Sequence, residues 1–361
     1  MIKKILIAIC AVLAFSSPCH AKEIAGAYIL MESDTRQIIK CQNENKPLPI
    51  ASTTKIMTAI VAAENASPDD IFTVSAVAQN QEGSSIYLRE GDSISVENLL
   101  YGLLMNSGND AAVVLAEGVS GSIDKFAELM NDKACEIGCK NTNFKNPSGL
   151  CEDGHYSTAY DMALITAYAA KNPLISKIMR SKQYSIVQNG SITYLKNHNK
   201  LLWQYEYCTG GKTGFTKLSG RCLAATAEKD GVRLVAVTLN CPDDWQEHKN
   251  LFDYGFEAVK RVSVIEQGSI IATRKINGTP VNLIAAEAVE IPKVNGKKIK
   301  ITAQLHLKEI SQAVEVGDFI GYADIYCNGC HVTKVSLKSG QKVEKASKFG
   351  VEFFKRLFFG K

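Results

Sequence analysis

The spacing of apolar and polar residues changes several times along the chain, and each change predicts a secondary-structure element. Residues 27–40 alternate apolar and polar side chains around Ser33-Asp34-Thr35, which predicts a β-hairpin. From residue 52 to about 64 the apolar positions instead recur as on one face of a helix. Helical spacing returns at residues 96–118, where two helices meet at Ser107-Gly108-Asn109, and at 123–138, 158–171 and 251–262; residues 222–240 hold two β-rich runs separated by Lys229-Asp230-Gly231.

The pattern changes again near residue 262. From there to about residue 343 short β runs are separated by turn signals, at Asn277-Gly278, Asn295-Gly296, Asn328-Gly329 and Ser339-Gly340. This spacing predicts a second, all-β domain. We therefore expect four segments, which are a leader (1–21), a larger domain (22–260), the β domain (261–343) and a C-terminal helix (344–361).

The last seventeen residues predict an amphipathic helix. Phe349, Phe353 and Leu357 follow one another at four-residue intervals, with Phe354 and Phe358 beside them. Positive charge lies on or near the other face, at Lys345, Lys348, Lys355, Arg356 and Lys361. Such a helix is too short and too charged to span a bilayer, but it suits the membrane interface. The alternative is a helix packed on the β domain.

The N-terminus has the three parts of a secretory signal. Lys3 and Lys4 precede an apolar run from Ile5 to Phe15, and Ala21 stands where a signal peptidase would cut. Eleven apolar residues are too few to cross a hydrocarbon core about 30 Å thick, which argues against a membrane anchor. We expect export.

Composition narrows the class of protein. A hydrophobic fraction of 46% and a charged fraction of 22% are ordinary for a globular protein and exclude a disordered, collagen-like or multi-spanning membrane protein. The formal net charge is only +4, and no long basic stripe precedes the C-terminus. Nucleic acid is therefore not an expected partner.

Cysteine usage leaves several readings open. Nine of the eleven cysteines follow the leader, an odd number, so at least one thiol has no partner within the exported chain. Buried thiols and a set of disulfides are equally compatible with a chain of this length. Cys135 and Cys139 are four residues apart on a predicted helix with Cys151 nearby in the sequence, a weak candidate for a zinc site. Cys327-Asn328-Gly329-Cys330-His331 fits a haem-attachment pattern, but Asn-Gly between alternating β residues favours a hairpin. We expect two free thiols there, and a disulfide across the turn is the alternative.

Three short motifs offer chemistry. The first is Ser52-Thr53-Thr54-Lys55 at the start of a predicted helix. Residues three apart share one helical face, so the Ser52 hydroxyl and the Lys55 amine can meet. A serine becomes a nucleophile when a neighbouring base takes its proton, and a buried lysine can be that base. Alone, this motif is weak evidence, because a Ser-x-x-Lys that occurs by chance is usually a helix N-cap followed by a solvated lysine.

The second motif is Ser107-Gly108-Asn109, which interrupts an apolar stretch. A hydroxyl and a carboxamide at this point can relay a proton and hydrogen-bond a peptide substrate. The competing interpretation is an ordinary turn between two helices.

The third motif is Lys212-Thr213-Gly214-Phe215-Thr216, just before the β-rich runs. A lysine and two hydroxyls at a strand edge suit a carboxylate, and Gly214 allows a substrate backbone to approach closely. An edge strand protected by its lysine is the alternative.

In this order, Ser-x-x-Lys, Ser-x-Asn and Lys-Thr-Gly resemble the motifs of the penicillin-recognising serine hydrolases. The chain is most similar to the low-molecular-weight D-alanyl-D-alanine carboxypeptidases over residues 25–260, and the likeness extends to the β domain and tail. Besides the motifs, the matching segments are PIASTTKIMTA, GSSIYLREGDSISVENLLYGLLMNSGNDAA, NPSGLCEDGHYSTAYDMA and GGKTGFTKLSG. The resemblance implies an antiparallel sheet flanked by helices, followed by a β-sandwich-like domain.

The resemblance also implies roles for the motif residues. Ser52 would be the acylated nucleophile, Lys55 its general base, and Ser107 and Asn109 would aid proton transfer and hold the substrate. The backbone N–H groups of Ser52 and Phe215 would form the oxyanion hole. Substrate contacts would come from Lys212, Thr213, Gly214 and Thr216, with Thr213 and Thr216 facing the terminal carboxylate.

The chain departs from the family pattern at one position. Many members have an arginine upstream of the closing helix that assists carboxylate binding, whereas this chain has Asp244-Trp245 there. The run from Pro242 to His248 resembles a sporulation-associated branch of the family. His155 with Asp161 could suggest a Ser-His-Asp triad, but the resemblance makes His155 structural, and Lys55 already supplies a base.

We therefore expect an exported DD-carboxypeptidase on the outer face of the cytoplasmic membrane. It would remove the terminal D-alanine from peptidoglycan stem pentapeptides through an acyl-enzyme, bind β-lactams covalently and need neither metal nor other cofactor. The alternatives are a serine β-lactamase, a DD-endopeptidase and a non-catalytic wall-binding protein. The first lacks its usual deacylating glutamate motif here, the second usually lacks the β domain, and the third would not need every motif residue.

Overall fold

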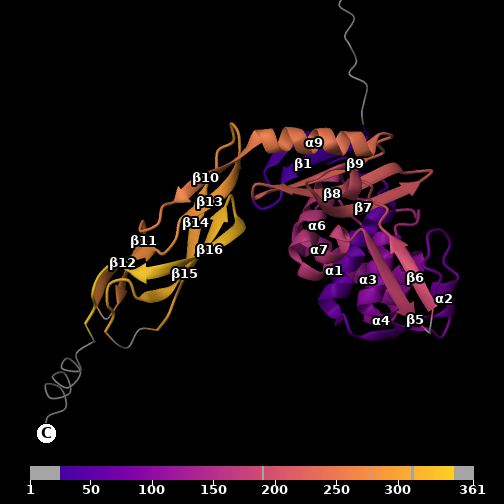
Figure 1. Cartoon of the computed structure of the whole chain (residues 1–361), viewed down its shortest axis with the longest axis horizontal. Coiled ribbons are helices and arrows are strands. Elements are labelled where there is room, and N and C mark those ends of the chain that lie inside the picture. The colour runs from indigo at the N-terminus through magenta and orange to yellow at the C-terminus, as the bar shows by residue number, and fades with distance from the viewer. Residues whose placement is uncertain (1–24, 189–190, 277, 310–312, 345–361) are drawn as a thin grey trace, which may run out of the picture.

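The computed structural model describes residues 25–188, 191–276, 278–309 and 313–344 (Figure 1). The predicted leader at 1–21, and all but Glu344 of the helix predicted at 344–361, lie outside the described residues. Within those residues, no helix combines the length and hydropathy needed to cross a membrane.

A five-stranded antiparallel sheet forms the centre of the N-terminal part, in the order β2-β1-β9-β8-β7 (Figure 1). Because successive strand residues point to opposite faces, Ala224 and Val235 join one hydrophobic core while Leu223 and Leu234 join another. β7 forms one edge of the sheet. The strands are β1 (Ala27–Glu32), β2 (Ile38–Gln42), β7 (Cys208–Thr216), β8 (Gly220–Lys229) and β9 (Val232–Leu239).

Helices cover both faces of this sheet. Seven contribute to the larger core, namely α1 (Lys55–Asn65), α2 (Ala76–Gln79), α3 (Val96–Met105), α4 (Asn109–Ser120), α5 (Ile123–Ile137), α6 (Ala159–Lys171) and α7 (Pro173–Arg180). On the opposite face α9 (Asp244–Ala258) packs Leu251 and Phe252 into the second core. The remaining elements are η1 (Ala51–Thr54), α8 (Leu201–Gln204) and two hairpins, β3 (Ile71–Thr73) with β4 (Ser93–Ser95) and β5 (Gln183–Gln188) with β6 (Ser191–Lys196).

Most predicted elements are confirmed, including the break between α3 and α4. Ser107 has φ of +62°, a left-handed conformation that takes the chain out of the helical path. The predicted closing helix is wrong at its end, because α9 stops at Ala258 and Val259 begins a strand. Val259 pairs with Val294, 35 positions further along, and this pairing overrides the local helical spacing.

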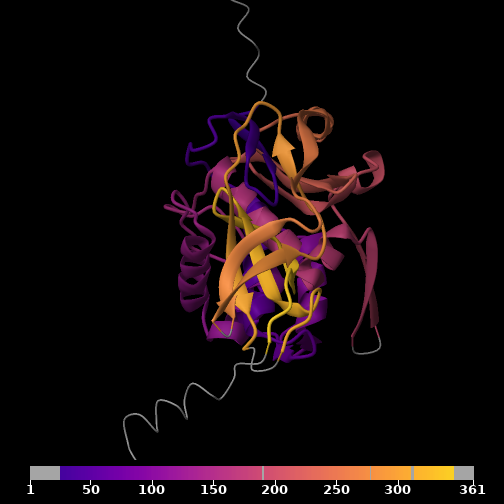
Figure 2. The same cartoon turned by 90° about the vertical axis from the view of Figure 1, so that its left-hand side faces the viewer.

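The C-terminal part is all β, as predicted (Figure 2). Its strands are β10 (Val259–Ile265), β11 (Ile270–Ile276), β12 (Thr279–Ala285), β13 (Val289–Val294), β14 (Ile301–Leu307), β15 (Phe319–Cys327) and β16 (Cys330–Ser339). They form a five-stranded sheet, β11-β12-β16-β15-β14, and the pair β10-β13. A separate core, with Leu283, Ile325 and Val335 among its members, holds this part together.

Candidate active site

Ser52 lies in the short 3-10 turn η1 that leads into α1. The turn starts from Ala51, whose φ of +46° is unusual for a residue with a side chain. Two glycines allow other segments to touch this turn. A Cβ on Gly214 of β7 would lie 3.0 Å from the Ser52 nitrogen, and a Cβ on Gly149 would lie only 2.0 Å from the Ala51 oxygen. The position of Ser52 is therefore fixed by close contact between the backbone of η1 and the backbones at Gly214 and Gly149.

Lys55 is fully buried beneath Ser52. Its Nζ donates to Ser52 Oγ at 3.1 Å, to Asn109 Oδ1 at 2.7 Å and to the Ser148 carbonyl oxygen at 2.6 Å. Burial lowers the pKa of Lys55 well below its ordinary value, the positive charge of Lys212 lowers it further, and Asp110 opposes both effects. A neutral amine at hydrogen-bond distance from a hydroxyl is the arrangement that a general base requires.

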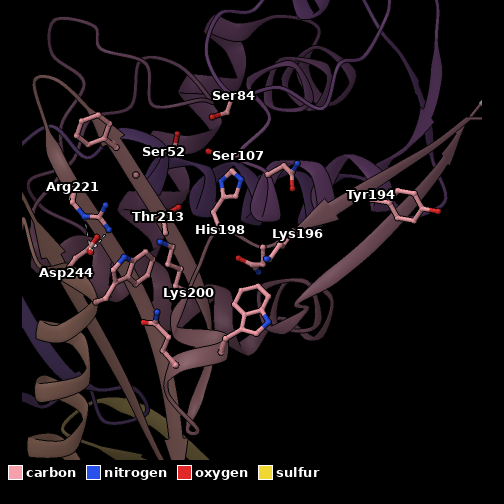
Figure 3. A pocket seen from close by; sticks show the side chains of 17 residues that line it. Ser52, Ser84, Ser107, Tyr194, Lys196, His198, Lys200, Thr213, Arg221 and Asp244 are labelled. Carbon is pink, nitrogen blue, oxygen red and sulfur yellow. Dashed lines mark hydrogen bonds and ion pairs between the residues drawn. The ribbon is translucent and has the colours of Figure 1, made fainter.

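Asn109, the first residue of α4, links Lys55 to a neighbouring loop. Its Oδ1 accepts from Lys55, while its Nδ2 donates to the Glu82 carbonyl oxygen at 2.6 Å. Both ends of the carboxamide are thereby fixed, which also settles its orientation. Ser107 is buried but lines the cavity beside Ser52 (Figure 3).

Lys212, Thr213 and Phe215 follow one another along β7, next to η1. Lys212 is buried, its Nζ donates to the Thr213 carbonyl oxygen at 2.8 Å, and burial lowers its pKa to about 7. Thr213, Gly214 and Phe215 line the cavity, whereas Lys212, which the resemblance implies as a substrate contact, lies behind them and is not part of the lining.

Thr216, at the end of β7, does not line the cavity. Its hydroxyl hydrogen-bonds Ser219 Oγ at 2.9 Å and accepts from Cys151 Sγ at 3.4 Å, and it is not among the cavity-lining residues. The structure therefore places Thr216 outside the cavity lining, whereas the sequence-based expectation has it facing the substrate carboxylate. Strand alternation explains this, because Thr213 and Thr216 are three apart and point to opposite faces.

A cavity of about 1000 Å³ opens in front of Ser52 (Figure 3). Besides the motif residues, its lining includes Arg221, Asp244 and Trp245, and also His198, the β5–β6 hairpin and the segment that follows it, namely Tyr194, Lys196, Lys200, Trp203 and Gln204. Only the centre of this cavity could be predicted from the sequence. Asp244-Trp245 is visible there as a departure from the family pattern, whereas Arg221, one residue before the predicted β run, carries no sequence signal of its place in the cavity.

Comparison with known proteins agrees with this geometry. The family model described as D-alanyl-D-alanine carboxypeptidase matches residues 15–243. The chain belongs to this family. A second model, the C-terminal domain of penicillin-binding protein 5, matches residues 260–345.

Similarity to individual relatives covers both parts of the chain. D-alanyl-D-alanine carboxypeptidase DacF of Bacillus subtilis is 30% identical over 346 residues, 92% of this chain and 88% of the relative. DacC of Escherichia coli is 32% identical over 350 residues, 90% and 86% of the two chains. Among solved structures, penicillin-binding protein 5 of Haemophilus influenzae has a TM-score of 0.67 at 29% identity, over 89% of this chain and 98% of that one.

His155 is structural in this carboxypeptidase-family chain, as expected. Its Nε2 hydrogen-bonds Thr54 Oγ1 at 2.9 Å, and its Nδ1 accepts from the Lys145 nitrogen at 3.2 Å. Burial lowers the pKa of His155 to about 4, so the ring is neutral near pH 7. The Asp161 carboxylate accepts instead from the Asn141 nitrogen and its neighbours. These contacts leave His155 and Asp161 no part in a Ser-His-Asp triad with Ser52.

The cysteine candidates separate in space. Cys139 Sγ donates to the Asp161 carbonyl oxygen, whereas Cys151 lies against Thr216. Within residues 25–344, gaps excepted, no group of three or more histidine, cysteine or acidic side chains is arranged to hold a metal, which removes the geometric basis for zinc at Cys135, Cys139 and Cys151. Cys327 and Cys330 are free thiols that face each other across the turn between β15 and β16, as the hairpin interpretation predicts.

Proposed function

We propose that this chain is a serine-type D-alanyl-D-alanine carboxypeptidase that removes the terminal D-alanine from peptidoglycan stem peptides. The observation that carries the proposal is the contact between Ser52 Oγ and the buried amine of Lys55, beside a cavity that Ser52 lines together with Ser107, Thr213 and Gly214. Family membership supports the same activity.

Acylation begins when Lys55 takes the hydroxyl proton and Ser52 Oγ attacks the carbonyl carbon of the penultimate D-alanine. Negative charge then collects on the carbonyl oxygen, where the N–H groups of Ser52 and Phe215 donate to it. As the tetrahedral intermediate collapses, the leaving amine receives the proton from Lys55, with Ser107 as the relay, and free D-alanine departs. The product is an ester on Ser52.

Deacylation repeats these steps with water. Lys55 removes a proton from the water, hydroxide adds to the ester carbonyl, and Ser52 leaves with the proton restored to its oxygen. Asn109 keeps the Lys55 amine aimed at Ser52 throughout, while Thr213 and Gly214 let the substrate backbone lie along β7. Penicillins enter by the same first step because a lactam is an activated amide.

The test is a mass measurement after incubation with penicillin and, separately, with a D-Ala-D-Ala pentapeptide. We expect an acyl adduct on the peptide that contains Ser52, and release of free D-alanine. Ser52→Ala should abolish both, and Thr53→Ser, a neighbouring hydroxyl change, should preserve them. An adduct that persists in folded Ser52→Ala protein would refute the nucleophile assignment. Rapid turnover of penicillin without D-alanine release would favour a β-lactamase.

We also infer export and attachment of the tail to the outer face of the cytoplasmic membrane. The three-part signal sequence at residues 1–21 supports export. The phenylalanine, lysine and arginine residues interspersed in residues 345–361 support attachment to a membrane surface. Anionic head groups attract such cations, and the rings add apolar burial. The full chain should co-sediment with anionic vesicles, more at low salt than at high, whereas a chain ending at residue 344 should stay in solution with its activity intact. Equal partitioning of the two would contradict the anchor.

A further inference from the structure

The proposed substrate ends in a carboxylate, so one wall of the cavity should carry a fixed positive charge. The cavity is lined by Arg221, by Lys196 and Lys200, and by His198. In Figure 3, Arg221 lies beside Asp244 on one side, His198 and Lys196 lie on the other, and Lys200 is drawn between them. The contacts of each group decide which can hold an anion.

Arg221 lies next to the strand that carries the oxyanion-hole candidate. In the antiparallel pairing of β7 with β8, Arg221 stands directly opposite Phe215, and Leu223 stands opposite Thr213. Residues directly opposite one another place their side chains on the same face of a sheet. Arg221 therefore shares a face with Thr213 and Phe215, both of which line the cavity.

The guanidinium of Arg221 is held in place by Asp244 and Trp245. Its Nε and Nη2 donate to the same oxygen of Asp244, Oδ1, at 3.1 and 2.6 Å. Asp244 is 2% exposed, and the Trp245 ring centroid lies 5.4 Å from the Arg221 Cζ atom. An arginine held by a buried carboxylate and an indole ring loses little freedom when it binds a second anion.

This arrangement leaves donors for that second anion. A guanidinium has five N–H groups, and Asp244 uses one on Nε and one on Nη2. The remaining N–H groups on Nη1 and Nη2 point away from Asp244, and the Arg221 side chain is 39% exposed. Two parallel N–H groups at the end of the guanidinium match the two oxygens of a carboxylate.

The other cations are less suited to this task. Lys196 is exposed, and its Nζ lies over the Trp203 ring, 5.6 Å from the centroid. Lys200 is also exposed. Burial and the charge of Lys212 lower the pKa of His198, which keeps the imidazole neutral near pH 7.

We propose that Arg221 binds the C-terminal carboxylate of the substrate through its free guanidinium edge, and that Asp244 is a positioning residue that aims it. The inference rests on the proposed carboxypeptidase function and adds to it the direction of the substrate. The terminal D-alanine lies toward Arg221, and the stem peptide extends toward the β5–β6 hairpin.

The experiment compares two peptides that differ only at the C-terminus, one ending in D-Ala-D-Ala with a free carboxylate and the other ending in its amide. For each enzyme variant, kcat/KM is measured for both by mass spectrometry of the released D-alanine or D-alaninamide. The ratio of the two values isolates recognition of the carboxylate from damage to the catalytic residues.

Arg221→Gln should lower the carboxylate-to-amide ratio about 10- to 100-fold, because a charge-assisted bidentate contact is lost. Arg221→Lys should fall between, since it keeps the charge but not the planar fork. Asp244→Asn should lower the ratio about 3- to 10-fold, whereas a purely structural role would lower kcat/KM for both peptides alike and leave the ratio unchanged. The double variant Arg221→Gln/Asp244→Asn leaves no buried carboxylate unpaired and guards against misfolding of the single variant.

Arg233→Gln is the matched control. Arg233 also donates through Nε and Nη2 to an aspartate, Asp34, but it does not line the cavity. The carboxylate-to-amide ratio of kcat/KM for Arg233→Gln should equal the wild-type ratio. A wild-type enzyme that prefers the free carboxylate, together with an unchanged ratio in both Arg221→Gln and the double variant, would overturn the inference alone. A wild-type enzyme that cleaves both peptides equally would also overturn it. Absence of any D-alanine release by the wild type would overturn the proposed function as well.

Discussion

Gly149 gives a direct test of how the loop after α5 holds the nucleophile. It has φ of +80°, and a Cβ added there would lie 2.0 Å from the Ala51 oxygen and 2.5 Å from the Ala51 carbon. The nearest ordinary contact between such a carbon and a carbonyl oxygen is about 3.3 Å. Gly149→Ala must therefore move the loop and the η1 turn apart by about 1 Å.

Two effects add up in this variant. An alanine in the left-handed region loses about 1–2 kcal/mol, and overpacking against rigid backbone adds about 1–3 kcal/mol, so we expect about 2–5 kcal/mol of destabilisation. The shift also separates Ser52 from Lys55, since Ser52 follows Ala51 and Lys55 bonds the carbonyl oxygen of Ser148. A misplacement of about 1 Å can lower a reaction rate about 100-fold.

Gly154→Ala is the matched control, because Gly154 has φ of +82° and belongs to the same loop. The nearest atom to its added Cβ is the flexible Lys145 Cε, at 3.4 Å. Only the backbone term of about 1–2 kcal/mol applies there. The assay measures the rate of acylation by a fluorescent penicillin and the free energy of unfolding in urea. Acylation of Gly149→Ala within about threefold of Gly154→Ala would refute the reasoning that backbone contact positions Ser52.

Three further predictions follow from the same structure. Because Lys55 must be neutral to act as the base, the acylation rate should rise with pH to a plateau. Lys55→Met should be acylated at least about 100-fold more slowly than wild type at every pH. Acylation of Lys55→Met at the wild-type rate would contradict this role. The pKa of His155 is about 4 in the folded state against 6.5 when unfolded, so the unfolded chain binds the proton first, and the free energy of unfolding should decrease as pH falls from 6.5 toward 4. His155→Gln should flatten that slope in urea titrations at several pH values, and an unchanged slope would argue against the shift. Replacing Cys327 and Cys330 with serine should leave D-alanine release within about twofold of wild type, because both thiols lie in the β part and neither lines the cavity. A larger loss would indicate that the β part acts on catalysis.

Local chemistry in the sequence accounts for much of this protein. The break between α3 and α4 is visible because Ser107-Gly108-Asn109 interrupts an apolar helix, and the β15–β16 hairpin because Asn-Gly favours a two-residue turn. The proximity of Ser52 to Lys55 follows from their three-residue spacing. Each of these inferences needs only a few neighbouring residues, so all three could be predicted from local patterns. The family and the mixed fold were instead implied by the resemblance that the three motifs and their flanking segments carry.

Tertiary structure decided what depends on residues distant in the sequence. Lys55 receives its unusual environment from Asn109 and Ser148, which lie 54 and 93 positions away. Arg221 reaches the cavity only because β8 pairs with β7 and α9 brings Asp244 beside it. Thr216 is turned away by strand alternation and by its bond to Ser219. Burial, strand register and ion pairs between residues far apart in the sequence arise only when distant segments pack together, and no local pattern encodes them.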